Sequence, residues 1–176
     1  QKLGLFLNPM QTRIRSRKAL MKSKTVMSQA LGILSRREVS SGQMRFMLAK
    51  KGFSSDSIDS CVERLEEWGY IDDASLSRNI LAAMLKNSPC GKRRCFYELE
   101  KRRFSKELID SLVEDVYRDL DERVLATAAA KQYAKNKVQW TLKDLKRLAR
   151  WLSRRGFTGE AVFSAVSAFG SELEAE

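Results

Sequence analysis

Residues 48–58 read Leu-Ala-Lys-Lys-Gly-Phe-Ser-Ser-Asp-Ser-Ile, and this stretch decides the fold because its pattern occurs three times in the chain. Residues 99–109 read Leu-Glu-Lys-Arg-Arg-Phe-Ser-Lys-Glu-Leu-Ile, and residues 152–162 read Leu-Ser-Arg-Arg-Gly-Phe-Thr-Gly-Glu-Ala-Val. A match of this length at constant offsets indicates an internal repeat of about fifty residues. The aligned phenylalanines lie 51 and 53 residues apart and are Phe53, Phe104 and Phe157.

Each of these segments predicts a turn between two helices. The phenylalanine before the turn and the aliphatic residue five positions later have the spacing of a hydrophobic staple. Gly52 and Gly156 suit the left-handed residue that ends a helix, whereas Arg103 takes that place in the second segment and predicts strain or a different turn. The hydroxyl residue after each phenylalanine can cap the next helix by accepting a backbone hydrogen bond. These residues are Ser54, Ser105 and Thr158.

The repeat predicts an all-α fold class, with three tandem three-helix repeats in an elongated array. Apolar residues recur every three or four positions in nine segments, and we find no convincing strand alternation. The repeats are expected at residues 25–71, 72–120 and 121–176, after a basic N-terminal extension at residues 1–24. The nine helices are expected near residues 25–35, 41–51, 55–68, 73–86, 92–102, 106–119, 122–136, 142–154 and 159–169.

The boundary between the first two repeats contains four residues that we interpret as a structural joint: Gly69, Tyr70, Asp72 and Asp73. Glycine and tyrosine stop one helix, and either aspartate can cap the next. Trp68 is expected to pack beside Tyr70.

The composition excludes several chemistries. The chain of 176 residues has no histidine, so it has no imidazole base and no histidine metal ligand. It has no glycine-rich phosphate loop, and its paired acids lack convergent partners. We therefore expect no catalytic residues, no metal and no cofactor. The longest apolar run near the start, residues 5–7, is too short for a signal or a membrane span.

Three cysteines are an odd number in a chain of this size, which favours reduced thiols and a cytoplasmic location. Cys61 and Cys95 fall at apolar helix positions and are expected to be buried. Cys90 lies in the loop at residues 88–91 and is expected to be the most exposed thiol. A monomer is the expected oligomeric state.

The net charge of +11 is unevenly distributed. Residues 1–24 hold seven basic residues and no acid, which fits either a solvated leader or a basic arm that touches polyanions. The middle helix of each repeat is basic and the last helix is acidic. A solvated face explains one such helix, but three favour a functional basic surface. The expected contacts are Arg45, Lys50, Lys51, Arg93, Arg94, Lys101, Arg102, Lys143, Lys146, Arg147, Arg150 and Arg154.

The eighth predicted helix shows this polarity best. Leu142, Leu145, Ala149 and Leu152 lie on one side, with the basic residues nearly opposite. The charge pattern also argues against major-groove reading by a helix-turn-helix, because the helix after each turn has an excess of acidic over basic residues.

Three tryptophans are candidates for stacking on bases. Trp151 lies between the apolar and basic faces of its helix and is the best interface candidate. Trp68 and Trp140 are the others.

Four short motifs carry a resemblance to a known family: Gly-Tyr-Ile-Asp-Asp at residues 69–73, Leu-Ser-Arg-Arg-Glu at residues 34–38, Gly-Lys-Arg-Arg-Cys leading to Glu-Leu at residues 91–99, and Arg-Arg-Gly-Phe at residues 154–157. With these motifs and its threefold repeat, the chain resembles the bacterial RecX family over about residues 26–170. Departures from the family pattern are Leu76, Lys92, Cys95 and Arg103-Phe104.

The resemblance implies a role without catalysis. RecX proteins bind the RecA filament on single-stranded DNA and restrain its ATPase, growth and strand exchange. The resemblance therefore implies two partners, the RecA nucleoprotein filament and single-stranded DNA. The alternative is a general DNA- or RNA-binding protein that acts through the basic helical surface, whose binding would weaken steeply with salt.

Overall fold

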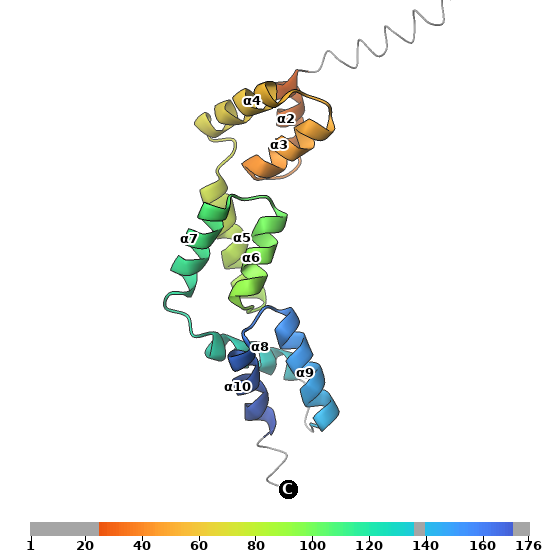
Figure 1. Ribbon diagram of the computed structural model, residues 1–176, viewed down its shortest axis with the longest axis vertical. Coiled ribbons are helices and arrows are strands. Elements are labelled where there is room, and N and C mark those ends of the chain that lie inside the picture. Colours follow the sequence, from red (N-terminus) through yellow and green to blue (C-terminus); the bar gives the residue numbers. More distant parts are fainter. Residues whose placement is uncertain (1–24, 136–139, 171–176) are drawn as a thin grey trace, which may run out of the picture. The chain divides into compact units, whose positions relative to one another are not determined.

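The computed structural model describes residues 25–135 and 140–170, and these residues form α-helices without a strand (Figure 1). The predicted all-α fold of three-helix repeats is confirmed, whereas the basic extension at residues 1–24 lies outside the described residues. Each helix begins and ends within about two residues of its predicted bounds. The helices are α2 (Val26–Leu34), α3 (Ser41–Lys50), α4 (Ser55–Glu67), α5 (Asp73–Asn87), α6 (Lys92–Lys101), α7 (Lys106–Tyr117), α8 (Glu122–Ala134), α9 (Leu142–Arg154) and α10 (Gly159–Gly170).

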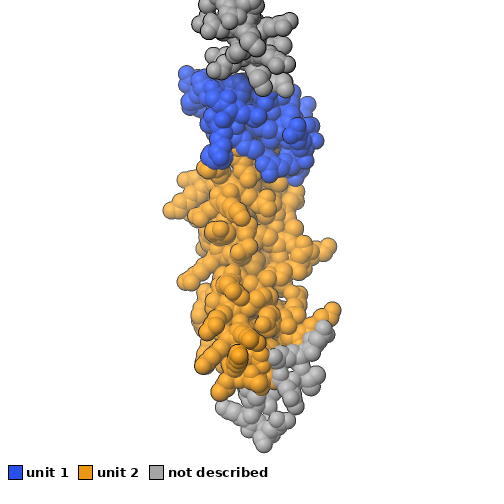
Figure 2. All heavy atoms as spheres, turned by 90° about the vertical axis from the view of Figure 1, so that its right-hand side faces the viewer, with its two compact units in different colours: residues 1–39, 44–71 blue, residues 40–43, 72–176 orange. Residues whose placement is uncertain are grey.

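The chain divides into two compact units, coloured separately in Figure 2. Of the described residues, 25–39 and 44–71 belong to the first unit, and 40–43, 72–135 and 140–170 belong to the second. The first unit has one apolar core, which includes Met44, Leu48 and Leu65. Phe53 packs against this core together with the buried Ile58, as the staple spacing predicts.

The second unit has two apolar cores. One gathers residues of α5, α6 and α7 around Leu81, Leu99 and Val113. The other gathers residues of α8, α9 and α10 around Leu148 and Leu152. With the core of the first unit there are three cores in the described residues, and each set of three helices buries its apolar side chains in a core of its own. The exact boundaries of the three repeats stay a prediction.

All three repeated turns use a left-handed residue. Gly52 and Gly156 have φ angles of 84° and 81°, and Arg103 has a φ of 58°. The second repeat therefore keeps the turn geometry of the others and places a residue with a side chain where glycine is favoured. Such a position costs about 1 kcal/mol relative to a right-handed one.

The hydroxyl caps are confirmed at two of the three turns. Ser105 accepts the backbone N–H of Leu108 at 3.2 Å, and Thr158 accepts that of Ala161 at 3.3 Å. The prediction for Ser54 was wrong, because its hydroxyl donates to the Ser57 hydroxyl at 2.9 Å and makes no capping bond.

The joint residues have defined local contacts. Asp72 accepts the backbone N–H of Ser75 at 2.8 Å and so caps α5. Gly69 has a φ of 71° after the end of α4. The rings of Trp68 and Tyr70 meet edge to face at 6.4 Å between centroids, as expected.

One residue of the predicted apolar face of α9 is exposed. Leu142 leaves 74% of its surface open to solvent, whereas Leu148 and Leu152 are fully buried. At about 100° per residue, Leu142 lies roughly 70° from the centre of the buried stripe. It is also the first residue of α9, where fewer helix neighbours cover a side chain.

Candidate functional site

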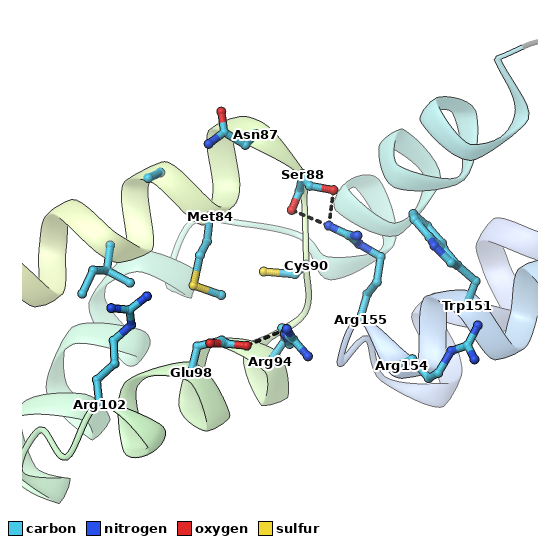
Figure 3. Close-up of a pocket in the computed structure, with 12 residues that line it drawn as sticks. Met84, Asn87, Ser88, Cys90, Arg94, Glu98, Arg102, Trp151, Arg154 and Arg155 are labelled. Atoms are coloured by element: carbon cyan, nitrogen blue, oxygen red, sulfur yellow. Dashed lines mark hydrogen bonds and ion pairs between the residues drawn. The ribbon is translucent and has the colours of Figure 1, made fainter.

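A groove of about 550 Å³ lies in the second unit between α5, α6 and the end of α9 (Figure 3). Apolar side chains of α5 form part of its wall, and the loop at residues 88–91 crosses it. Arginines of α6 and α9 line the rest. Its lining residues are Ile80, Ala83, Met84, Asn87, Ser88, Cys90, Arg94, Glu98, Arg102, Trp151, Arg154 and Arg155.

The charged residues of α6 reach the groove because they are spaced four apart. Arg94 and Glu98 lie one helical turn apart on α6, and Arg102, the C-cap residue of α6, follows one turn later on the same side (Figure 3). Arg94 pairs with Glu98 at 2.5 Å, which neutralises one positive charge. Four arginines and one glutamate line the groove, so it favours an anionic ligand.

Arg155 holds the loop that crosses the groove. Its Nε donates to the carbonyl of Pro89 at 3.0 Å, and its Nη2 donates to the carbonyl of Ser88 at 2.8 Å and also to the Ser88 hydroxyl. The Arg155 guanidinium lies 4.7 Å from the centroid of the Trp151 ring, and Tyr133 packs on Trp151 at 5.0 Å. Trp151 is therefore half-buried and held in place where it lines the groove.

Two glycines let the chain segments beside the groove approach closely. The backbone N–H of Gly91 donates to the carbonyl of Arg155 at 3.0 Å. A Cβ on Gly91 would lie 2.1 Å from the carbonyl oxygen of Gly156, and a Cβ on Gly156 would lie 2.3 Å from the backbone nitrogen of Arg94. Neither position has room for a side chain.

A carboxylate of α8 ties together the beginnings of two helices. Glu122 Oε1 accepts the backbone N–H of Lys92 at 2.8 Å, and Oε2 accepts that of Thr158 at 3.2 Å. Also within the second unit, Asp73 accepts the backbone N–H of Ser41 at 2.9 Å and its hydroxyl at 2.7 Å. Glu122 and Asp73 are each the first residue of a helix, and they bind the first residues of α6 and α3, Lys92 and Ser41.

The outer face of α9 carries the most concentrated positive charge of the predicted surface. The Arg147 guanidinium lies 3.8 Å from the Asp144 carboxylate, which is a long distance for an ion pair. The Arg147 side chain is exposed to solvent. Within residues 25–135 and 140–170, no acidic side chain lies within ion-pair distance of Lys143, Lys146 or Arg150. The face is made of the exposed residues Lys143, Lys146, Arg147, Arg150 and Arg154.

The structure brings some of the predicted contact residues together and leaves others apart. Arg94, Arg102, Arg154 and Trp151 line one groove. Arg93 and Lys101 are exposed elsewhere on α6.

The predicted contacts of α3 belong to the first unit. Arg45 is paired there with Asp59 at 3.0 Å, which offsets its charge. The Lys50 ammonium lies 4.6 Å from the Phe46 ring, and Lys51 is exposed.

Two expectations about exposure were wrong. Trp140 is only 5% exposed and packs on Phe169 at 5.0 Å, so it is not available to stack on bases. Cys90 is only 2% exposed, because Arg155 holds its loop against the rest of the unit. Cys61 and Cys95 are buried, as predicted.

Sequence reasoning missed Arg155 and Glu122 as organising residues. A signal was present for Glu122, because it and Asp73 both stand at the first position of the first helix of a repeat. Arg155 gave no comparable signal, since its partners lie 66 and 67 residues away in the chain.

The described residues lack two kinds of feature. Within residues 25–135 and 140–170, no helix has the length and apolar character needed to cross a membrane. In the same residues, no three cysteine or acidic side chains gather as a set that could hold a metal ion.

These features define a helical repeat protein with an arginine-lined groove and a basic helix beside it. The profile for the first three-helix domain of RecX matches residues 27–65. A regulatory protein RecX of Chlorobium phaeobacteroides (strain BS1) is 30% identical over 139 residues, which cover 79% of this chain and 89% of that relative. One from Trichlorobacter lovleyi is 30% identical over 135 residues, covering 76% and 88%. The chain belongs to the RecX family of regulatory proteins.

A solved structure agrees in fold. The crystal structure of RecX from Lactobacillus salivarius superposes with a TM-score of 0.65 at 14% identity, covering 82% of this chain and 94% of that one. At this identity the likeness concerns the fold alone.

Proposed function

We propose that this RecX-family protein binds the RecA filament on single-stranded DNA and inhibits RecA ATPase, filament growth and strand exchange without catalysing a reaction itself. It would act in DNA recombination as a monomer in the cytoplasm. The observation that carries the proposal is the basic face of α9, which ends at the arginine-lined groove through Arg154.

The physical basis is the attraction of a polyanionic filament to exposed positive charge. Lysines and arginines that neutralise phosphates release counterions, which favours binding at low salt. The field of such a face also speeds encounter with an anionic partner. The α9 face would therefore meet DNA phosphates or an acidic surface of RecA.

The groove supports a second candidate function, a general single-strand nucleic-acid binder. Trp151 is held beside arginines, and an aromatic ring next to positive charge is what sequence-independent binding to single strands requires. In this case the protein would act on DNA or RNA alone, and RecA would respond only through competition for the strand.

RecA ATPase on single-stranded DNA separates the two, with this protein titrated well below the RecA concentration. Inhibition at substoichiometric amounts supports action on the filament. Inhibition that begins only when the protein saturates the DNA supports strand competition and contradicts the filament proposal.

A matched variant ties the effect to α9. Replacing Lys146 and Arg150 by glutamine is expected to weaken inhibition, whereas replacing the exposed Lys86 and Lys106 of α5 and α7 is expected to leave it unchanged. Equal effects of the two double variants would contradict a specific role of the α9 face.

A further inference from the structure

Two cysteines of the second unit lie next to each other in the wall of the groove. The Sγ atoms of Cys90 and Cys95 are 3.7 Å apart. Cys90 lies in the loop before α6, and Cys95 is the fourth residue of α6, where it is fully buried. The third cysteine, Cys61, belongs to the first unit, and its Sγ contacts the Met27 sulfur at 4.0 Å.

The surroundings of the pair favour a thiolate on Cys90. A hydrogen bond between the two thiols, together with the charges of Arg155 and Arg94, lowers the pKa of Cys90 to about 7. The same bond and burial raise the pKa of Cys95. Cys90 is therefore the nucleophile of the pair, because the thiolate is the reactive form.

The pair is also held in position. The Tyr117 hydroxyl donates to the carbonyl of Cys90 at 2.6 Å and lies 3.3 Å from the Cys95 sulfur. Cys90 lines the groove, and Figure 3 shows its side chain directed into the space between α5 and α6. Although only 2% of its surface is exposed, Cys90 lines the groove and Cys95 does not, so a small uncharged oxidant that enters the groove would reach the Cys90 sulfur first.

We propose that Cys90 and Cys95 form an oxidisable dithiol, in which Cys90 reacts with a hydroperoxide that enters the groove and Cys95 then closes an intramolecular disulfide. In the first step the Cys90 thiolate attacks the peroxide. A sulfur–oxygen bond forms, the oxygen–oxygen bond breaks, and the sulfur is oxidised by two electrons to a sulfenic acid. The hydroxide or alkoxide that leaves takes the proton that the Cys90 thiol lost on ionising, to give water or an alcohol.

In the second step Cys95 attacks the Cys90 sulfur. The sulfur–sulfur bond forms, the sulfur–oxygen bond breaks, and the hydroxide that leaves takes the proton of the Cys95 thiol to give water. With hydrogen peroxide, two thiols and one peroxide give one disulfide and two waters. The sulfurs must move from 3.7 Å to about 2.05 Å to form this bond.

The test treats the reduced full-length chain with hydrogen peroxide, blocks the remaining thiols with N-ethylmaleimide and maps the peptides without reduction. Trypsin cuts after Lys92, Arg93 and Arg94, so the disulfide would join the peptide of residues 87–92 to the peptide of residues 95–101. We expect this joined pair, with Cys61 recovered as the blocked thiol. The test uses the protein alone and does not depend on the proposed function.

Three variants assign the roles. In Cys95→Ser the sulfenic acid on Cys90 should persist and be trapped by dimedone. In Cys90→Ser the oxidation of Cys95 should be about tenfold slower than that of Cys90 in the parent. Cys61→Ser is the control and should behave like the parent protein.

The parent protein alone keeps the proposal open to refutation, even if a variant fails to fold. Oxidation of Cys61 as fast as Cys90 would overturn it, because burial raises the pKa of Cys61 and no second thiol is near it among the described residues. A disulfide between two chains, or recovery of all three thiols after peroxide treatment, would also overturn it.

Discussion

Glu122 caps Lys92: one carboxylate oxygen of Glu122 accepts the backbone N–H of Lys92 at 2.8 Å, and the other accepts that of Thr158 at 3.2 Å. The first N–H groups of a helix have no partner inside the helix. The N-cap residue of α6 is Gly91, which has no side chain to supply a cap. The Glu122 side chain of α8 therefore accepts a hydrogen bond from the first turn of α6, which the N-cap residue of α6 does not.

Replacing Glu122 by alanine is expected to lower the free energy of unfolding by about 2 kcal/mol, because two backbone N–H groups lose their acceptor. Urea unfolding followed by circular dichroism would measure this change. The control is Glu114→Ala, which removes the exposed ion pair between the Glu114 carboxylate and the Lys92 ammonium, 3.8 Å apart. This change should lower the free energy of unfolding by less than about 0.5 kcal/mol. Equal losses in the two variants would contradict the capping role.

Two glycine substitutions separate turn geometry from close packing. Gly52 and Gly156 share a left-handed conformation. Of the two, only Gly156 lies against another stretch of backbone, because a Cβ added there would lie 2.3 Å from the backbone nitrogen of Arg94. Gly52→Ala is expected to cost about 1 kcal/mol, and Gly156→Ala about 3 kcal/mol or more. Arg103 shows that the fold tolerates a side chain in the left-handed turn itself. Similar losses at both glycines in urea unfolding would argue against the close approach.

The basic face of α9 is expected to control the salt dependence of binding. Replacing Lys143, Lys146 and Arg150 by glutamine should weaken binding to single-stranded DNA at least about tenfold at low salt, and should reduce the salt slope by about 2. Fluorescence anisotropy over a series of salt concentrations measures both quantities, and circular dichroism checks that helical content is unchanged.

A triple variant with the same loss of charge serves as the control for this experiment. Lys86, Lys106 and Lys131 are exposed and belong to α5, α7 and α8, not to α9. Their replacement by glutamine should change affinity by less than about threefold, since it alters only the long-range field. If both triple variants lose affinity equally, net charge and not the α9 face governs binding.

The alkylation rate of Cys90 should follow the ionisation of its thiol. The pKa of Cys90 is lowered to about 7 in the folded chain, so its reaction with iodoacetamide should be half-maximal near pH 7 and should slow as the pH falls below it. Burial raises the pKa of Cys61, so that thiol should react only at more alkaline pH. Peptide mapping of alkylated protein distinguishes the two. Identical pH profiles would contradict the assignment.

Arg155 is expected to influence both the loop and the thiol. Arg155→Ala removes the donors to the Ser88 and Pro89 carbonyls together with a charge that lowers the pKa of Cys90. It should lower the melting temperature and move the Cys90 alkylation profile to higher pH. Arg155→Lys retains the charge without the forked guanidinium, so it should lower the melting temperature while moving the profile less. A profile that moves equally in both variants would show that geometry, and not charge, sets the pKa.

Helices and turns were predictable because their signals are local. A phenylalanine, a capping hydroxyl and a left-handed position lie within a few residues of each other in every repeat, and the bounds of α4, α7 and α10 follow from them. Ser54 is the exception, because another hydroxyl, that of Ser57, lies close enough to compete for its hydrogen bond.

The groove was only partly predictable, because it depends on contacts between distant parts of the chain. The pattern of basic residues indicated Arg94, Arg102 and Arg154, but it did not indicate that they line one cavity. Cys90 lies in a loop with serine, proline and glycine, which locally favours exposure, and its burial comes from Arg155 more than sixty residues later.

The shared cap on Lys92 and Thr158 also determines where the chain can be cut. A fragment that ends after α7 would leave out Glu122 and leave the first turn of α6 without its acceptor, so we expect such a piece to fray at that helix start. A fragment that begins at Asp121 would keep Glu122 but lose Lys92. A piece that runs from Asp72 to Gly170 keeps the cap of α5 and both partners of Glu122.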